Sequence, residues 1–305
     1  MIRAIAKYRF EDKDSFESKI IPYLFGGGIF YKKPVPNYEI KNKRALVDVK
    51  TGSLSQLITV LTGMLRYSAG CVLEDIEIVD CSIAPLKDKT LSEKISLGVI
   101  LKPSLKFQEG IVSDLIKLAV KNKIDFVKDD DASEYSKEDS NKINGLVSDL
   151  DYFQKIVNPD SLVSDCAMIV PWVDGWNLVG EISNKHVTMV HCAGLSQQIS
   201  WSSHIIFSRL AGASFVVVSD PLFDKDFNLD VALDSATRET KGVGKTKLIL
   251  SGGINPERIK GIIKSVNERF IPYIGFAVGS WVLSGNLENN FALLKEMKDD
   301  TKPIF

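Results

Sequence analysis

From residue 96 onward the sequence repeats one unit: a short, almost wholly apolar run, a polar or glycine-containing turn, and an amphipathic segment. The runs are "LGVILKP", "IDFVKDD", "CAMIVPW", "VTMVHCAG", "FVVVSDP", "KLILSGGI" and "IPYIGFAVGS". Strands that are apolar on both sides must be covered on both faces, and helices between them make neighbouring strands parallel. The pattern predicts a (β/α) barrel or a large wound parallel sheet.

In residues 132–166 the assignment of strand and helix is ambiguous. "NGLVSDL" could be a strand with its helix at "YFQKIVN", or the whole segment could be one irregular helix. A barrel of eight strands depends on this unit. The predicted fold is therefore a C-terminal (β/α)8-type TIM barrel that is either complete or one unit short.

Residues 1–95 have a different pattern. The alternating runs "RAIAKYRF", "RALVDVK" and "CVLEDIEIVDCSIA" surround one helix, "SLSQLITVLTGMLRYSA", which Ser53 is expected to cap. This indicates a small α+β domain with an antiparallel sheet, of the ferredoxin-like kind. We expect two domains, at 1–95 and 96–305.

Composition limits the partners of the chain. With 38 basic and 39 acidic residues among 305, no overall field would gather nucleic acid or an anionic membrane. The four cysteines form neither metal-type pairs nor a disulfide framework, which fits a reducing, cytoplasmic compartment. The first residues lack the apolar core of a signal peptide, and no later segment is apolar enough to span a membrane. We expect no export and no membrane insertion.

Polar residues follow the apolar runs at the points where the strands should end. They are Lys102, Lys128 to Asp131, Trp172 and Asp174, His191, Asp220, Ser251 to Gly253, and Gly279 with Ser280. In barrels and open α/β sheets the carboxyl ends of the strands carry the chemistry, because the loops converge there. The arrangement predicts one site at this end of the sheet.

The stretch "KIDFVKDDDASEY" has two interpretations. Strand alternation sends Lys128 and Asp130 to one face and Asp129 to the other, and Asp131 can turn back as the strand ends. The residues then form either a solvated acidic turn or a site of oxygen ligands for Mg²⁺, in which a buried Lys128 has become a carbamate. Taken alone, the stretch favours the solvated turn.

Two glycine turns suggest phosphate binding. "SGGI" before "NPERIKGIIKSV" and "FAVGSWV" each place backbone amides after a strand, where a barrel commonly binds phosphate. "KGVGKTK" is not a P-loop, because Glu239 occupies the place of its first glycine. A lone histidine such as His191 is more often a core residue than a catalyst, so it counts only with its neighbours.

Together these motifs resemble the ribulose-bisphosphate carboxylase (RuBisCO) large-subunit family. "GVILKPSL" resembles the family's first barrel strand, and "DFVKDDD" resembles "DFTKDDE". "MVHCAG", "SRLAGASFVVVSD" and "LILSGGI" resemble "HIHRAM", "LRLSGGDHIHSG" and "PVASGGI". Upstream, "GSLSQLITVLTGMLRYSAGCVLEDIEI" resembles a family helix and the strand after it. The matches occur in order across most of the chain.

The resemblance implies roles for particular residues. CO₂ would form a carbamate on Lys128, and Asp130 and Asp131 would complete the Mg²⁺ ligands. Lys102 matches the lysine that moves protons during enolisation, and His191 matches an active-site histidine. Ser251, Gly252, Gly253 and Gly279 match phosphate-binding turns, and Lys225 matches the lysine of a mobile loop that closes over substrate.

Departures from the family pattern limit the reaction. Asp131 replaces a glutamate, Ser104 a second lysine, Cys192 an arginine that holds the second phosphate, Val218 a histidine near it, and Met64 an asparagine from the partner subunit. Aspartate also replaces the glycine before Lys225. With these groups missing, a true carboxylase is the least favoured outcome.

The profile is that of a divergent, shortened, type IV-like RuBisCO-like protein. It implies an Mg²⁺-dependent enolase, isomerase or decarboxylase that forms a metal-stabilised enediolate on a mono-phosphorylated keto sugar or a related keto compound. The alternative is a catalytically silent relative that acts in binding or regulation. The family pattern also implies a homodimer or a higher homo-oligomer, with a site between one subunit's barrel and the other's amino-terminal domain.

Overall fold

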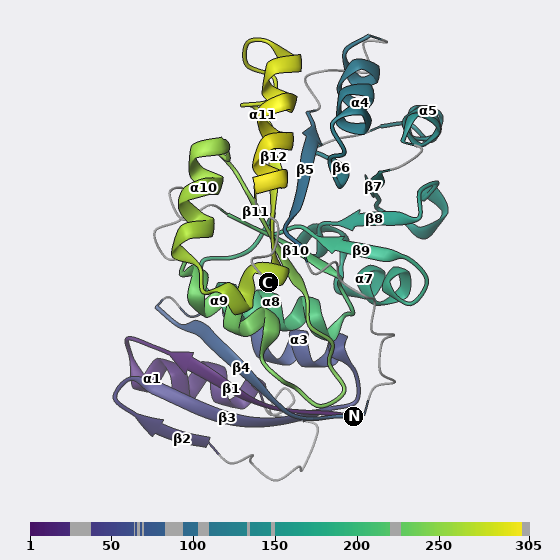
Figure 1. Ribbon diagram of the computed structural model, residues 1–305. Coiled ribbons are helices and arrows are strands. Elements are labelled where there is room, and N and C mark those ends of the chain that lie inside the picture. Colours follow the sequence, from purple (N-terminus) through teal and green to yellow (C-terminus); the bar gives the residue numbers. More distant parts are fainter. Residues whose placement is uncertain are drawn as a thin grey trace.

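The computed structural model describes residues 1–24, 38–63, 65, 68, 70–82, 94–102, 110–132, 135–147, 150–219 and 227–300. A small sheet with its helices lies below a larger barrel in the view of Figure 1. Lys225, Ser104 and Met64 lie outside the described residues. No helix in the described ranges combines the length and the apolarity that a membrane crossing needs.

The N-terminal unit is an antiparallel sheet with helices on one face (Figure 1). Its strands are β1 (Ile2–Arg9), β2 (Tyr38–Lys41), β3 (Arg44–Thr51) and β4 (Val72–Cys81). Its helices are α1 (Lys13–Ser15), a π-helical turn (Phe16–Ile20), α2 (Ile21–Leu24) and α3 (Leu54–Thr62). The strand order β2-β3-β1-β4 with antiparallel neighbours is ferredoxin-like, as the alternating runs predicted.

Local sequence explains this unit well. Along β1, Ala4 and Ala6 are fully buried and the residues between them are more exposed, which is the period of two that a half-buried strand requires. Ser53 caps α3, because its hydroxyl accepts a hydrogen bond from the Gln56 amide at 3.1 Å.

The second unit is a closed barrel of eight parallel strands, so the predicted TIM barrel is confirmed and is complete. Its strands are β5 (Ser96–Leu101), β6 (Phe126–Asp129), β7 (Asp151–Lys155), β8 (Cys166–Ile169), β9 (Val187–Val190), β10 (Phe215–Ser219), β11 (Lys247–Ser251) and β12 (Ile274–Val278).

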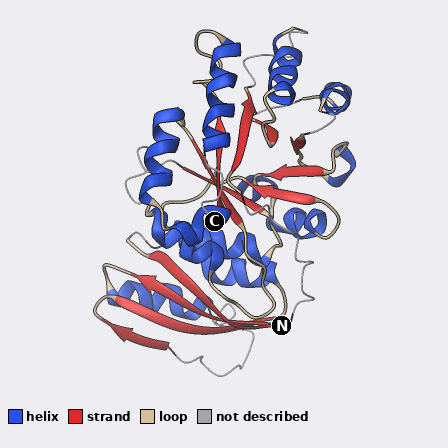
Figure 2. Cartoon of the chain, in the orientation of Figure 1, coloured by secondary structure: helices blue, strands red, loops and turns tan. Residues whose placement is uncertain are grey.

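Helices surround these strands in the described part of the chain (Figure 2). They are α4 (Ile111–Lys121), α5 (Lys137–Leu146), α6 (Pro171–Asp174), α7 (Trp176–Ser183), α8 (Trp201–Leu210), α9 (Leu229–Thr237), α10 (Pro256–Ser265) and α11 (Leu287–Asp300), with 3₁₀ turns at Pro159–Ser161 and Glu268–Tyr273. The division of the chain immediately before β5 stays a proposal.

The detailed interpretation of residues 132–166 was wrong. "NGL" ends helix α5, and the apolar part of "YFQKIVN" is strand β7 rather than a helix. Ser136 begins the helix, since its hydroxyl accepts from the Asp139 amide at 3.1 Å. Tyr152 and Phe153 are both buried in β7, Tyr152 toward the helices and Phe153 inside the barrel. Because both faces are apolar, the strand shows no alternation of apolar and polar residues.

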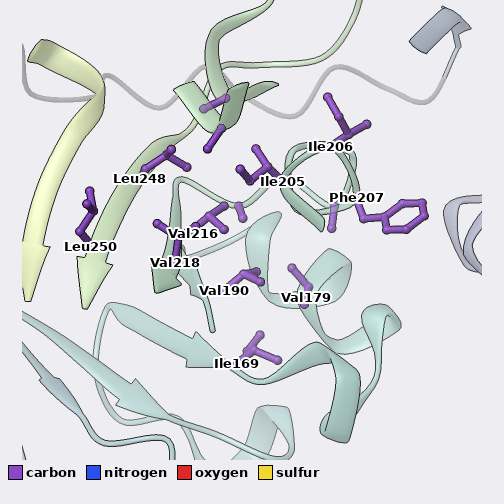
Figure 3. Close-up of a cluster of buried hydrophobic side chains, with 14 of the residues drawn as sticks. Ile169, Val179, Val190, Ile205, Ile206, Phe207, Val216, Val218, Leu248 and Leu250 are labelled. Atoms are coloured by element: carbon purple, nitrogen blue, oxygen red, sulfur yellow. The ribbon is translucent and has the colours of Figure 1, made fainter. Parts of the chain in front are cut away.

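Two apolar layers hold the barrel together. One lies between the strands and the surrounding helices, where Ile205, Ile206 and Phe207 of α8 lie over strands β9 to β11 (Figure 3). The other fills the barrel interior. It consists of Ile100, Phe126, Phe153, Cys166, Met168, Met189, Val217, Ile249 and Ala277.

A loop of the barrel also joins the N-terminal sheet. The loop after β9 runs parallel to the start of β4, pairing Leu73 with Ile199. The Leu73 amide donates to the Gln198 carbonyl at 2.8 Å, and the Ser200 amide donates to the Leu73 carbonyl at 3.0 Å. The Gln198 side-chain amide donates to the Leu65 carbonyl at 2.6 Å. The two units are therefore connected by backbone pairing as well as by packing.

Gly98 leaves space for the Phe126 ring inside the barrel. A Cβ on Gly98 would lie 2.0 Å from an atom of the Phe126 ring. Phe126 packs edge-on against Phe153, with ring centroids 5.6 Å apart, so the ring has well-packed neighbours on its other side. Glycine at position 98 is required by space rather than by backbone conformation.

We expect Gly98→Ala to lower the free energy of unfolding by about 1–3 kcal/mol, because the added methyl overpacks the interior. Gly261→Ala is the matched control. Gly261 lies within α10 with nothing within 4 Å of the added Cβ, and the substitution should be neutral or stabilising by about 0.5–1 kcal/mol. Urea unfolding followed by circular dichroism measures both. Equal stability of the two variants would contradict the packing argument.

His204 is a buried core histidine. Its Nδ1 accepts a hydrogen bond from the Trp172 indole N–H at 3.0 Å, and its ring also lies against Trp176 and Trp201. The side chain is fully buried, and burial lowers its pKa to about 3. His204 is therefore neutral in the folded state.

This depressed pKa makes stability depend on pH. Between pH 6.5 and about 3 the unfolded chain binds a proton at His204 that the folded chain does not, so the free energy of unfolding falls as the pH falls. The loss at this one group amounts to about 2 kcal/mol between about pH 7.5 and about pH 5. In His204→Phe the loss measured by urea unfolding at the two pH values should be smaller by that amount. An unchanged loss would show that His204 is not the group that titrates.

Candidate active site at the mouth of the barrel

The register of the strands brings the predicted site residues to one rim. β12 pairs with β5 so that Val278 lies beside Val99, and β5 pairs with β6 so that Leu101 lies beside Asp129. Gly279, Lys102 and Asp130 follow these strands directly. Three adjacent strands therefore deliver a glycine, a lysine and a carboxylate to the same place.

Lys128 points into the barrel. It follows Phe126 by two residues on β6, and its Nζ lies 3.5 Å from the sulfur of Met168, another interior residue. The side chain is 1% exposed, and Nζ donates to the Asp129 carbonyl at 2.6 Å. Burial lowers the pKa of Lys128 to about 8, although the negative charge of Asp130 partly opposes the shift.

Asp129 points the opposite way, toward the helices. Its carboxylate accepts hydrogen bonds from the Tyr152 hydroxyl at 3.0 Å and from the Lys155 amide at 2.8 Å. Burial raises the pKa of Asp129 to about 7, and these two hydrogen bonds act in the opposite direction by stabilising the carboxylate. Asp129 fixes the end of β6 against β7 and does not face Lys128 across the mouth.

Asp130 and Asp131 shift each other's pKa. Burial opposes ionisation of Asp130, but hydrogen bonds from Asp131 and Lys102 outweigh it and lower the pKa of Asp130 to about 2. Burial and the hydrogen bond to Asp130 raise the pKa of Asp131. Asp130 Oδ2 accepts a hydrogen bond from Lys102 Nζ at 2.7 Å.

His191 follows β9 and faces the same charges. Burial lowers its pKa to about 3, and the positive charge of Lys128 adds to this shift. Its Nδ1 accepts from the Ala193 amide at 3.2 Å, so the proton of the neutral ring lies on Nε2. His191 is thus a neutral hydrogen-bond donor at Nε2.

The glycine turns differ from one another. Ser251 ends β11, and Gly252 and Gly253 follow with φ of 89° and 60°, which only glycine adopts without strain. The side-chain amide of Asn255 then begins helix α10. After Gly279 the chain forms turns, and α11 begins only at Leu287, so this second turn is not a helix start.

Gly279 is instead packed against Lys102. A Cβ on Gly279 would lie 2.9 Å from Lys102 Cε. The absence of a side chain at position 279 lets the lysine stem pass close to the backbone on its way to Asp130. The sequence suggested either phosphate binding or a steric need for Gly279, but it did not predict Lys102 as the neighbour.

Several positions around the site have other surroundings than the family resemblance suggested. Val218 is fully buried in the layer between strands and helices and does not line the mouth (Figure 3). Cys192 is partly exposed and lines a neighbouring cavity. Met168 and Tyr152, which contact Lys128 and Asp129, were missed because an apolar strand gives no sign of which residue its neighbour will touch.

No protein-family model matches the chain, and no curated protein matches it in sequence. Solved structures do match. A Rubisco-like protein from Rhodopseudomonas palustris has a TM-score of 0.72 and 14% identity over 99% of both chains. The chain has the RuBisCO fold. RuBisCO from Pyrococcus horikoshii has a TM-score of 0.72 and 13% identity over 98% of this chain and 89% of its own. A rubisco-like protein (MtnW) from Alicyclobacillus acidocaldarius has a TM-score of 0.65 and 13% identity over 99% of this chain and 95% of its own.

On this RuBisCO fold, the donor set fits a hard divalent cation only if Lys128 takes part. Within the described ranges no group of three or more histidine, cysteine, aspartate or glutamate side chains is arranged to hold a metal. Asp130 and Asp131 supply two carboxyl groups, and burial together with the hydrogen bond to Asp130 raises the pKa of Asp131. A carbamate on Lys128 would supply the third oxygen group, and the lowered pKa favours the neutral amine that reacts with CO₂.

We expect Gly279→Ala to displace the Lys102 side chain from Asp130, because the added methyl would lie 2.9 Å from Cε. Lys102 should then be acetylated several-fold faster by limiting acetic anhydride, as measured by peptide mass spectrometry. Gly180→Ala, in α7 with nothing within 4 Å of the new Cβ, is the control and should leave the rate unchanged. An unchanged rate in Gly279→Ala would mean that the glycine does not position Lys102.

Proposed function

We propose that this chain is a divergent RuBisCO-like enzyme that enolises a mono-phosphorylated keto sugar or a related keto compound with Mg²⁺. The observation that carries the proposal is the placement of Lys128 in the barrel mouth. Its side chain is almost wholly buried, and it lies two residues before Asp130, the carboxylate that Lys102 contacts at 2.7 Å. A solvated acidic turn would leave these groups exposed, whereas Asp130 is 8% exposed. The interpretation favoured by the stretch alone therefore gives way to the site.

Lys128 (as a carbamate), Asp130 and Asp131 would hold the Mg²⁺. When bound, the ion supplies an electrophile that makes the carbon beside a chelated carbonyl more acidic. The one-methylene shorter side chain of Asp131 sets it further back than a glutamate, and its raised pKa works against its role as an anionic ligand.

The remaining steps use this chain's own groups. Lys102 Nζ is placed to carry a proton between a substrate carbon and the rim, with Asp130 holding it in position. His191 stays neutral and can donate its Nε2 proton in a hydrogen bond to a substrate oxygen as negative charge develops there. The buried setting of His191 strengthens this hydrogen bond.

Phosphate would bind at the turn formed by Ser251, Gly252 and Gly253. Its glycines leave the backbone amides open to a ligand, and helix α10 starts just beyond it. Gly279 stays a predicted contributor, with its close approach to Lys102 as the constraint on any ligand there. Cys192 in place of an arginine supports a substrate with one phosphate.

A catalytically silent RuBisCO-like binding or regulatory protein is the second candidate. The same replacement at Cys192, together with the direct pairing of Lys102 and Asp130, supports it. A homodimer or higher homo-oligomer and a cytoplasmic location stay predictions from the sequence. The Pyrococcus horikoshii RuBisCO that shares the fold is octameric, which supports self-association.

The decisive experiment is to trap CO₂ on lysine. After incubation with ¹³C-bicarbonate and Mg²⁺, a carbamate signal in ¹³C NMR should be present in the wild type and absent in Lys128→Met. Lys247 is a matched buried lysine whose pKa is also lowered to about 8 by burial, but it contacts the Lys94 carbonyl and Ser96 at the other end of the barrel. Lys247→Met should keep the signal.

Solvent-deuterium exchange into ketose phosphates then tests the chemistry. The wild type should exchange the proton beside the carbonyl, and Lys102→Met and Lys128→Met should lose that exchange by several orders of magnitude. A carbamate without exchange on any ketose phosphate would favour the silent relative. Absence of both carbamate and Mg²⁺ binding would remove the enolising function.

A further inference from the structure

A large cavity lies between the N-terminal sheet and the barrel loop that follows β9. It has a volume of about 940 Å³, and its walls include the outer side of β1, β3 and β4 and the first residues of α8 and α9. None of the predicted site residues that the structure describes lines it. Its volume is within the range of cavities that hold small organic ligands, roughly 300–1,000 Å³.

Three cations gather on one wall of this cavity. Lys7 and Arg9 come from β1 and Arg44 from β3, and the strand register places Arg9 directly opposite Arg44. Like charges in directly opposed positions of a sheet are destabilising. All three converge on Glu74, which lies 3.2 Å from Arg9 Nε, 2.9 Å from Arg44 Nε and 3.9 Å from Lys7 Nζ.

A single carboxylate does not neutralise this wall. Among the residues that the structure describes, the other acid lining the cavity is Asp75. It is engaged by the Ser202 hydroxyl at 2.5 Å and by Arg238 at 3.4 Å. Arg9 donates to Glu74 through Nε at 3.2 Å, and its side chain is 51% exposed. The wall therefore has a surplus of positive charge in a chain whose net charge is −1.

Two helices begin at the opposite side of the cavity. Ser200 caps the ten-residue helix α8, and Asn228 caps the nine-residue helix α9, and both caps line the cavity. Helix starts carry partial positive charge and amide donors, which favour anions. Asp230 lies in the first turn of α9 but not in the cavity wall. Two helix starts and three cations thus face one space.

We propose that this cavity binds the phosphoryl group of a small molecule through Lys7, Arg9 and Arg44, which are not among the predicted residues of the barrel mouth. Arginine forks and a lysine are suited to the negatively charged oxygens of phosphate. Trp201 lines the same space and offers an apolar face to the rest of the molecule. The proposal does not depend on enolisation.

The place of the cavity also links it to His191. Cys192, Ala193 and Gly194, which directly follow that histidine, form part of the cavity wall. The loop continues to Ile199, where it pairs with Leu73 beside Glu74. A ligand bound by the cations would therefore contact the loop that directly follows His191 and could change the position of that histidine.

Pyrophosphate is the probe for this site. At constant ionic strength its binding to the full-length protein is measured by calorimetry and by tryptophan fluorescence. We expect saturable binding with a fluorescence change that is lost in Trp201→Phe. Arg9→Gln and Arg44→Gln should each raise the dissociation constant roughly tenfold, the value of one lost charge-assisted contact.

Arg3→Gln is the matched control. Arg3 lies on the same strand and the same face as Arg9, and it pairs with Asp48 at 2.6 Å outside the cavity. This variant should bind pyrophosphate as the wild type does. Binding at the glycine turns of the barrel would be unaffected by Arg9→Gln and Arg44→Gln. Wild-type affinity in both variants, or no saturable binding by the wild type, would overturn the proposal.

Discussion

The hydrogen bonds that pair β12 with β5 close the sheet into a barrel, and they fix the position of the site. They set Val278 beside Val99, and as a result Gly279 lies against the Lys102 stem and Lys102 reaches Asp130. A parallel register one residue away would move each of these groups to the other face of its strand. The packed interior around Phe126 holds that register, because a close-packed core accepts little displacement.

Much of the fold followed from pattern alone. Apolar runs bounded by glycine and polar residues located all the barrel strands except β7, and alternation located three strands of the N-terminal sheet. β7 was missed because Tyr152 and Phe153 are both buried on opposite sides of a strand of five residues. β2 lies at the sheet edge with little buried surface, so its sequence has no strong period.

The site was predictable as a set of positions but not as a set of contacts. Alternation correctly separated Asp129 from Lys128, since a strand has a fixed period of two. The contact of Met168 with Lys128 and that of Gly279 with Lys102 join distant parts of the chain, and no local pattern encodes them. The same holds for the cavity beside Glu74, whose walls come from both units. Low identity with solved structures of the same fold shows that the architecture tolerates replacement at most positions.

The pairing of Leu73 with Ile199 affects how the N-terminal unit would behave if it were separated from the barrel. β4 is an edge strand of its sheet, and an uncovered edge offers unpaired backbone groups to any other strand. In the whole chain the barrel loop covers the start of that edge, and Ser200 and Ser203 add hydroxyl contacts to the Glu74 and Leu73 carbonyls. The barrel loop thus keeps other chains from pairing with the start of β4. A fragment cut before β5 would expose this edge and would be more prone to aggregate.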